Sequence, residues 1–294
     1  MDHLKPITLG GVDLELEVLG EGEPVVVIQT ALTADELRPL AQQITLSGGY
    51  QGIHYHRRGY AASGPLLRPG SVAADAADCR ALMEALNVEP AHVVGVSYSA
   101  AIALTLASTA PETVRTLTVM EPPPAGVPSA PQFLAVIARL LETFRAKGSL
   151  VALDEFLTVL VGSDWQGESE RDLPGSVAAM ERDADTFFES DLPALLSWDF
   201  DVQDAATIRC PVLYVGGSDS GPWFAEVRAR ILQLLPHAED TTVLRAGHLL
   251  ASTHPSDAAK LVVNFLRRHP RSGPVLTGGE PPPQSCHGST ESPA

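Results

Sequence analysis

Residues 93–100 join a short apolar run to a serine and a small-residue helical pattern. They read Val-Val-Gly-Val-Ser-Tyr-Ser-Ala, with Ser97 at the junction. A serine on a sharp turn from strand to helix exposes its hydroxyl as a nucleophile, and small residues two positions away on either side let the backbone bend. Gly95 and Ser99 occupy those two positions. The segment therefore predicts Ser97 as a nucleophile, against the alternative that Ser97 only caps the helix.

His248 is a candidate general base, and the family resemblance described below places the base in its loop. It follows the β-prone run at 242–244 in an Ala-Gly-His sequence, and a second helical pattern starts soon afterwards at Pro255. Histidine titrates near neutral pH, so it can take the serine proton and return it to a leaving group. An ordinary loop histidine is the competing interpretation. The order of serine before histidine along the chain is also what that resemblance implies.

Strands and helices must alternate to hold these two residues at one edge of a sheet. β-prone runs fall at 6–20 (two strands), 25–28, 51–55, 91–96, 113–120, 211–215 and 241–244. Helical patterns fall between them, at 34–46, 71–86, 98–110, 222–235 and 255–268. This alternation predicts a parallel sheet covered on both faces.

Two segments depart from the alternation. Residues 122–205 open with three prolines and carry helical patterns near 131–147, 149–161, 174–190 and 191–198, which indicates an inserted helical cap. Residues 271–294 are rich in Pro, Gly, Ser and Thr and predict a disordered tail.

The chain resembles the α/β-hydrolase superfamily, especially its cap-bearing esterases and lactonases, over roughly residues 20–125 and 205–268. Besides the serine segment, the likeness lies in 55–63 (YHRRGYAAS), similar to a D-x-R-G-x-G-x-S loop, in 119–123 (VMEPP) and in 246–248 (AGH). The resemblance implies an α/β class chain with the α/β-hydrolase fold, a mostly parallel eight-stranded sheet with helices on both faces. Residues 1–121 and 206–270 would form the core and residues 122–205 the helical cap.

The resemblance leaves two candidates for the acid that orients the histidine. In most members the acid follows the seventh strand, where this chain has Ser220 in the usual register and Asp219 one position earlier. In some lactonases and dehalogenases the acid ends the sixth strand, where this chain has Glu121. Glu121 is favoured over Asp219. Either carboxylate would accept the second N–H of the histidine.

The resemblance also implies an oxyanion hole made by two backbone N–H groups. One would come from Tyr98, directly after the nucleophile, and the other from Ala31 in the loop after the third strand. The family usually has His-Gly in that loop, whereas this chain reads Gln-Thr-Ala-Leu from Gln29 to Leu32. In the 55–63 segment, His56, Arg57 and Arg58 are expected to have structural roles.

These residues together predict a serine hydrolase that cleaves an uncharged, moderately hydrophobic ester or lactone through an acyl-enzyme. Such chemistry needs no cofactor and no metal. The alternative is a non-hydrolytic binding protein, or a member with altered chemistry, on the same scaffold. Covalent labelling by an electrophilic serine reagent separates the two.

Composition narrows the partners to small molecules. The 294 residues carry a formal net charge of −16 with 45% hydrophobic residues, so nucleic acid and anionic membranes are not expected partners. No signal-like leader and no apolar run near about 20 residues is visible. Cys79, Cys210 and Cys286 are too scattered for a disulfide framework. A cytoplasmic location is expected, and the oligomeric state stays open.

Overall fold

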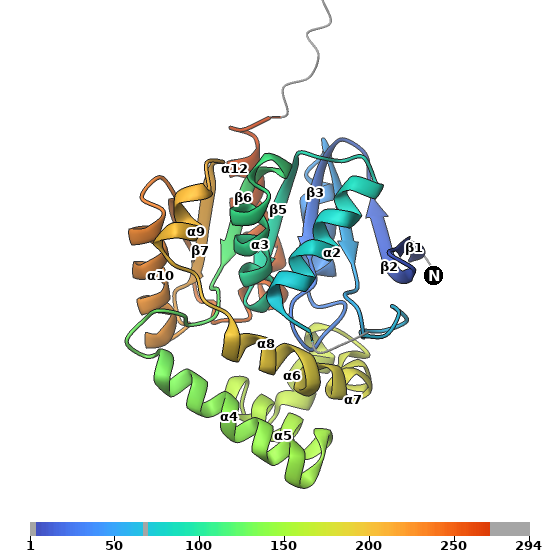
Figure 1. The fold of residues 1–294 in the computed structure, drawn as a ribbon, viewed down its shortest axis with the longest axis vertical. Coiled ribbons are helices and arrows are strands. Elements are labelled where there is room, and N and C mark those ends of the chain that lie inside the picture. Colours follow the sequence, from blue (N-terminus) through green and yellow to red (C-terminus); the bar gives the residue numbers. More distant parts are fainter. Residues whose placement is uncertain (1–3, 67–69, 271–294) are drawn as a thin grey trace, which may run out of the picture.

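An eight-stranded sheet runs through the centre of the fold, as Figure 1 shows. The computed structural model describes residues 4–66 and 70–270. The strands are β1 (Lys5–Leu9), β2 (Val12–Leu19), β3 (Glu23–Ile28), β4 (Tyr50–Tyr55), β5 (Ala91–Val96), β6 (Val114–Met120), β7 (Val212–Gly217) and β8 (Glu239–Val243). Their order is β1-β2-β4-β3-β5-β6-β7-β8, in which β2 is antiparallel to both neighbours and all pairs from β4 to β8 are parallel. The expected mostly parallel eight-stranded sheet is confirmed.

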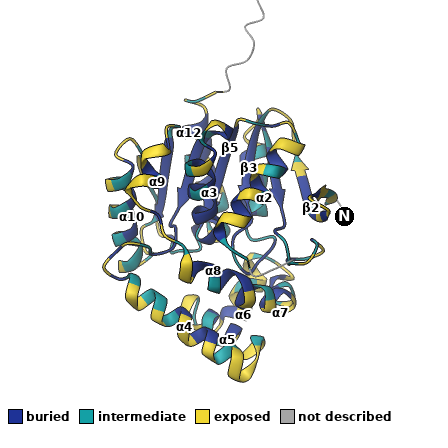
Figure 2. Cartoon of the chain, viewed as in Figure 1, coloured by how far each residue is buried: buried dark blue, intermediate teal, exposed yellow. Residues whose placement is uncertain are grey.

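Helices cover both faces of this sheet. They are α1 (Arg38–Leu46), α2 (Val72–Ala85), α3 (Tyr98–Thr109), the 3-10 turn η1 (Pro111–Thr113), α9 (Val202–Thr207), α10 (Pro222–Leu234), α11 (Leu250–Thr253) and α12 (Pro255–Leu266). One face is covered by α1, α11 and α12, whose buried side chains share one hydrophobic cluster. The other is covered by α2, α3 and α10, which share a second cluster. The central strands β3 to β7 are largely buried between these layers (Figure 2), whereas the edge strands β1 and β8 are mostly exposed or half-buried.

A separate group of helices lies beyond the carboxyl ends of the parallel strands (Figure 1). It comprises α4 (Ala130–Lys147), α5 (Ser149–Leu160), α6 (Trp165–Asp172), α7 (Ser176–Thr186), the π-helical turn η2 (Phe187–Asp191) and α8 (Leu192–Ser197). The sequence pattern did not predict α6, which is polar apart from one anchor. Its Trp165 is buried, and the indole N–H donates to Asp154 at 3.0 Å.

Three predicted boundaries differ from the structure for local reasons. The helix expected from residue 34 begins only at Arg38, because turns occupy residues 34–37. The helical pattern expected over 174–190 changes to a π-helical turn at Phe187, so its last residues face a different direction. The eighth strand covers Glu239–Val243 rather than 241–244, because the chain forms a turn from Leu244.

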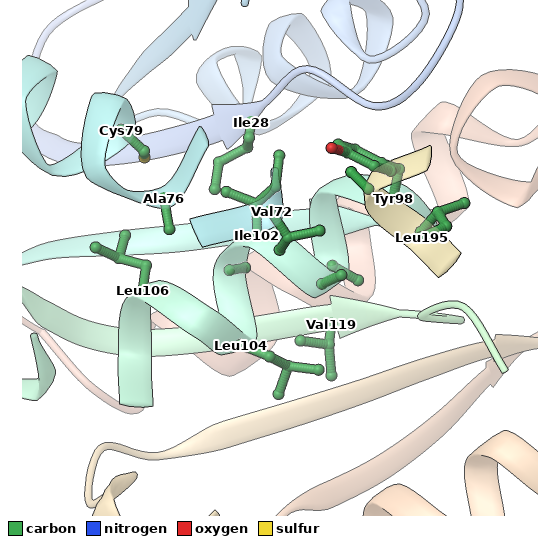
Figure 3. Packing of buried hydrophobic residues seen from close by; sticks show 14 of the residues in the cluster. Ile28, Val72, Ala76, Cys79, Tyr98, Ile102, Leu104, Leu106, Val119 and Leu195 are labelled. Atoms are coloured by element: carbon green, nitrogen blue, oxygen red, sulfur yellow. The ribbon is translucent and has the colours of Figure 1, made fainter. Parts of the chain in front are cut away.

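The helix behind Ser97 is held close to the sheet by small side chains. Ala100, Ala101 and Ala103 of α3 are fully buried. Figure 3 shows Tyr98 and Ile102 of this helix among apolar side chains of α2 and the sheet, with Leu195 of α8 at the same end as Tyr98. The start of α3 therefore contacts both the core and the group of helices beyond the strands.

Within residues 4–66 and 70–270, no helix has both the length and the apolar character that a bilayer crossing demands. The predicted disordered tail at 271–294 lies outside the described residues.

Candidate active site

Ser97 stands on a strained turn between β5 and α3. Its backbone has φ 51° and ψ −119°, and its N–H donates to the Met120 carbonyl at 2.9 Å. A non-glycine residue at positive φ costs free energy and is frequent at functional sites. A Cβ on Gly95 would lie 2.2 Å from the Ser99 carbonyl oxygen, so only glycine fits there. The Ser99 hydroxyl accepts the Val96 N–H at 2.9 Å and closes the turn.

A hydrogen-bonded chain connects Ser97, His248 and Glu121. His248 Nε2 lies 3.0 Å from Ser97 Oγ, and Nδ1 lies 2.9 Å from Glu121 Oε2. Glu121 is 1% exposed, and its Oε1 accepts the Gly217 N–H at 2.7 Å. The carboxylate is therefore held from both sides at the end of β6, in an orientation that fixes the imidazole ring.

Asp219 is not part of this hydrogen-bonded series of side chains. It is exposed, and its Oδ1 accepts the Ser218 hydroxyl at 2.9 Å. Its backbone N–H donates to the Ala246 carbonyl at 2.9 Å, which ties the main chain after β7 to the loop that carries His248. Asp219 thus contacts the histidine loop through its backbone rather than through its carboxylate.

Phe224 of α10 stacks on the imidazole of His248. The ring centroids are 4.0 Å apart and the planes differ by 13°. An aromatic face favours a positively charged ring above it. Phe224 was not among the predicted site residues, because nothing in the sequence around α10 indicates that its first turn faces His248.

Ala31 and Tyr98, the two residues expected to form the oxyanion hole, both lie near Ser97. Ala31 lines the same pocket as Ser97, and Tyr98 is the first residue of α3. The neighbouring Leu32 has φ 67° and donates its N–H to the Tyr60 hydroxyl at 3.1 Å. The Thr30 hydroxyl donates to the Val96 carbonyl at 2.8 Å. Leu32 is therefore engaged away from Ser97, and the N–H groups of Ala31 and Tyr98 are the candidates for the oxyanion hole.

The pocket in front of Ser97 has mainly apolar walls and an acidic fringe. Its charged lining residues within the described chain are all carboxylates, and burial raises the pKa of one of them, the half-buried Glu36, to about 7. The helices beyond the strands contribute the apolar lining residues Phe156, Leu157, Leu160, Val161, Leu173, Met180 and Phe187. The acidic lining residues are Glu36, Glu168 and Asp172.

One cluster in the described residues has the side-chain types of a metal site. The ligand atoms of Asp35, His54 and His56 lie within 4.8 Å of one another. Hydrogen bonds already engage the ring nitrogens: His56 lies between Glu15 (2.9 Å) and Asp35 (3.1 Å). His54 lies between two backbone carbonyls, at 3.1 and 3.0 Å. These bonds give the cluster a structural explanation, as expected for His56.

Comparison with known proteins gives one family. The family model of the alpha/beta hydrolase fold matches residues 24–255. A curated relative, "Putative carbamate hydrolase RutD" from Caulobacter sp. (strain K31), is 28% identical over 228 residues, which cover 76% of this chain and 84% of the relative.

Solved structures agree on the fold. A thermophilic esterase from Thermogutta terrifontis has a TM-score of 0.76 at 17% identity, covering 91% of this chain and 100% of that one. The enol-lactonase from Burkholderia xenovorans LB400 has a TM-score of 0.69 at 19% identity, covering 90% and 100%. The family match, the sheet order and the strained serine turn agree, and the chain belongs to the alpha/beta hydrolase fold family.

Proposed function

We propose that this hydrolase cleaves an uncharged, moderately hydrophobic ester or lactone through an acyl-enzyme on Ser97. The observation that carries the proposal is the hydrogen-bonded chain from Glu121 through His248 to Ser97, which opens on a largely apolar pocket. A serine hydroxyl is a weak nucleophile unless a base takes its proton. In this protein His248 is that base, and Glu121 is the acid that orients it.

The first half of the reaction acylates Ser97. Its Oγ attacks the carbonyl carbon while its proton passes to His248 Nε2, and the buried Glu121 stabilises the resulting imidazolium. The N–H groups of Ala31 and Tyr98 donate to the oxygen that becomes negative. His248 then gives its proton to the leaving alkoxide as the carbon–oxygen bond breaks.

The second half returns the enzyme to its starting state. Water attacks the acyl carbon and gives a proton to His248, and the new tetrahedral intermediate uses the same two N–H donors. Collapse of that intermediate releases the acid and returns the proton to Ser97 Oγ. No cofactor enters either half of this scheme.

The pocket and the relatives support the substrate class. Apolar walls favour an apolar acyl or alcohol group, and the acidic fringe disfavours an anionic one. The relatives are named for carbamate, ester and lactone hydrolysis, which all break a bond between a carbonyl carbon and a heteroatom. In this proposal residues 122–205 roof the pocket as a cap, and residues 1–121 and 206–270 hold the reacting groups.

Covalent labelling tests the proposal directly. The parent chain is treated with a fluorophosphonate and its intact mass is measured beside Ser97→Ala. Ser108→Ala is the matched control, because Ser108 lies further along α3 and donates only to a helix carbonyl. One adduct is expected on the parent and on Ser108→Ala and none on Ser97→Ala. An unlabelled parent, or a labelled Ser97→Ala, would overturn the assignment.

A further inference from the structure

A buried ion pair joins the helices beyond the strands to the core below the oxyanion loop. Arg57 is 2% exposed, and Asp191, the last residue of η2, is 0% exposed. The guanidinium donates to Asp191 at 2.6 and 3.1 Å and to Asp75 at 3.0 Å. A charge pair this deep is stabilising only when its hydrogen bonds are well made, and removing one partner leaves the other charge uncompensated.

The same residues hold the oxyanion loop. Arg57 also donates to the Thr30 carbonyl at 3.2 Å. The Tyr60 hydroxyl donates to Asp191 at 2.5 Å and accepts the Leu32 N–H at 3.1 Å. Ala31 therefore lies between two residues whose backbone groups are both fixed by partners of Asp191.

The second side of the hole is reached by the same guanidinium. The guanidinium carbon Cζ of Arg57 lies 4.5 Å from the ring centroid of Tyr98, and the Tyr98 hydroxyl donates to Asp75 at 2.8 Å. Tyr98, one of the two proposed donors, therefore contacts Arg57 and Asp75 directly. Ala31, the other donor, lies between Thr30 and Leu32, which contact Arg57 and Tyr60.

The loop needs such support because of its backbone. Leu32 has φ 67°, in the left-handed region that a branched side chain rarely adopts. A glycine would adopt this conformation without cost, but the loop has none between Gln29 and Leu32. The hydrogen bond to Tyr60 is the contact that holds the Leu32 N–H in the required direction.

We infer that Asp191 is a positioning residue for the oxyanion hole: it acts through Tyr60 and Arg57 to set the direction of the Ala31 N–H. This inference rests on the proposed function. Asp191 touches no reacting atom, and it lies 160 residues after Ala31 in the sequence. The same buried pair therefore connects the helices beyond the strands to the oxyanion loop.

Tyr60→Phe is the sharpest test, because it removes only the hydroxyl that links Asp191 to Leu32. Tyr55→Phe is the matched control: Tyr55 is equally buried, and its hydroxyl makes no hydrogen bond to the loop. We measure kcat and KM on a short-chain ester, and Ki for a trifluoromethyl ketone, whose adduct with serine carries the oxyanion. Thermal unfolding of each variant checks that it folds.

A positioning role predicts a loss confined to the transition state. In Tyr60→Phe, kcat is expected to fall by about ten-fold or more while KM changes by less than about two-fold. Ki for the ketone should rise by the same factor as kcat/KM falls, and Tyr55→Phe should match the parent. Unchanged kcat and Ki in a folded Tyr60→Phe would overturn the inference, as would equal effects on kcat and KM.

Asp191→Asn completes a double-mutant cycle with Tyr60→Phe. If Asp191 acts through Tyr60, the losses in kcat are less than additive, whereas strictly additive losses would refute the connection. Fluorophosphonate labelling of the parent separates this result from the proposed function. A labelled parent with a silent Tyr60→Phe defeats only the positioning role, while an unlabelled parent defeats the hydrolase mechanism itself.

Discussion

Replacing Glu121 by glutamine tests the acid of the site with almost no change in shape. Glu121 Oε1 accepts the Gly217 N–H at 2.7 Å, so a glutamine at this position turns its carbonyl oxygen toward Gly217 to keep that bond. Its NH2 group then faces His248 Nδ1, which the carboxylate oxygen faces at 2.9 Å in the parent. Nδ1 becomes an acceptor, and the ring proton moves to Nε2.

The magnitude follows from that tautomer. With a proton already on Nε2, the imidazole cannot accept the Ser97 proton across the 3.0 Å contact. The stabilisation of the imidazolium by a buried anion is lost at the same time. In serine hydrolases the corresponding change from acid to amide lowers kcat by about 10⁴, or about 5 kcal/mol in activation free energy. We expect a loss of that order, with KM nearly unchanged.

Steady-state kinetics on a chromogenic ester measure this loss. Asp219→Asn is the matched control, because Asp219 is exposed and its carboxylate accepts only from Ser218 among the described residues. Asp219→Asn is expected to retain parent activity. Full activity in Glu121→Gln, or a similar loss in both variants, would refute the assignment of Glu121 and return Asp219 to consideration.

Three further changes have defined outcomes. Gly95→Ala places a Cβ 2.2 Å from the Ser99 carbonyl oxygen, so chemical denaturation should show a loss of about 1–3 kcal/mol, and labelling by a fluorophosphonate should cease; parent-like labelling would contradict the turn geometry. Phe224→Ala removes the ring 4.0 Å from His248, so kcat should fall by about five- to ten-fold, and Phe224→Tyr should restore it. Burial raises the pKa of Glu36 to about 7, above its ordinary 4.5, so the stability that the protonated form provides below pH 4.5 is lost as pH rises toward 7. Glu36→Gln should therefore increase the free energy of unfolding near pH 8 by at most about 3 kcal/mol, with a higher melting temperature, and leave both unchanged near pH 4. Equal effects at both pH values would contradict the raised pKa of Glu36.

Local signals were enough to propose Ser97 as the nucleophile, whereas the proposal of His248 as the base also needed the family resemblance. Ser97 lies where an apolar strand meets a helix of small residues, and both elements are set by residues within a few positions of it. His248 lies in a loop five residues after the end of the last strand, so its position is less closely set by that strand. A strand followed directly by a functional side chain can be read from one segment of sequence, because the segment carries its own geometry.

The choice of acid depended on contacts between strands. Glu121 and Asp219 both follow strands next to each other in the sheet, so the sequence could rank them but not measure their distance from His248. The backbone bonds after β7 turn the Asp219 carboxylate outward, and they form only in the folded chain.

The residues that contact the candidate site from distant helices left no local signal. Phe224 and Asp191 come from helices whose faces are set by packing, and Asp191 lies at the end of a π-helical turn that no periodic pattern predicted. The sequence predicts a structural role for Arg57, but only the structure identifies its partner Asp191, which lies 134 residues away.

The buried pair of Arg57 and Asp191 limits how members of this family can be recombined. A graft that replaced residues 122–205 with the equivalent segment of a relative would leave Arg57 buried opposite whatever that segment carries. Without a carboxylate at the position of Asp191, Arg57 would keep only Asp75 as a charged partner and would lose the two hydrogen bonds that Asp191 accepts at 2.6 and 3.1 Å. Specificity transfer by exchange of the helical segment therefore has to bring along the acid that faces Arg57.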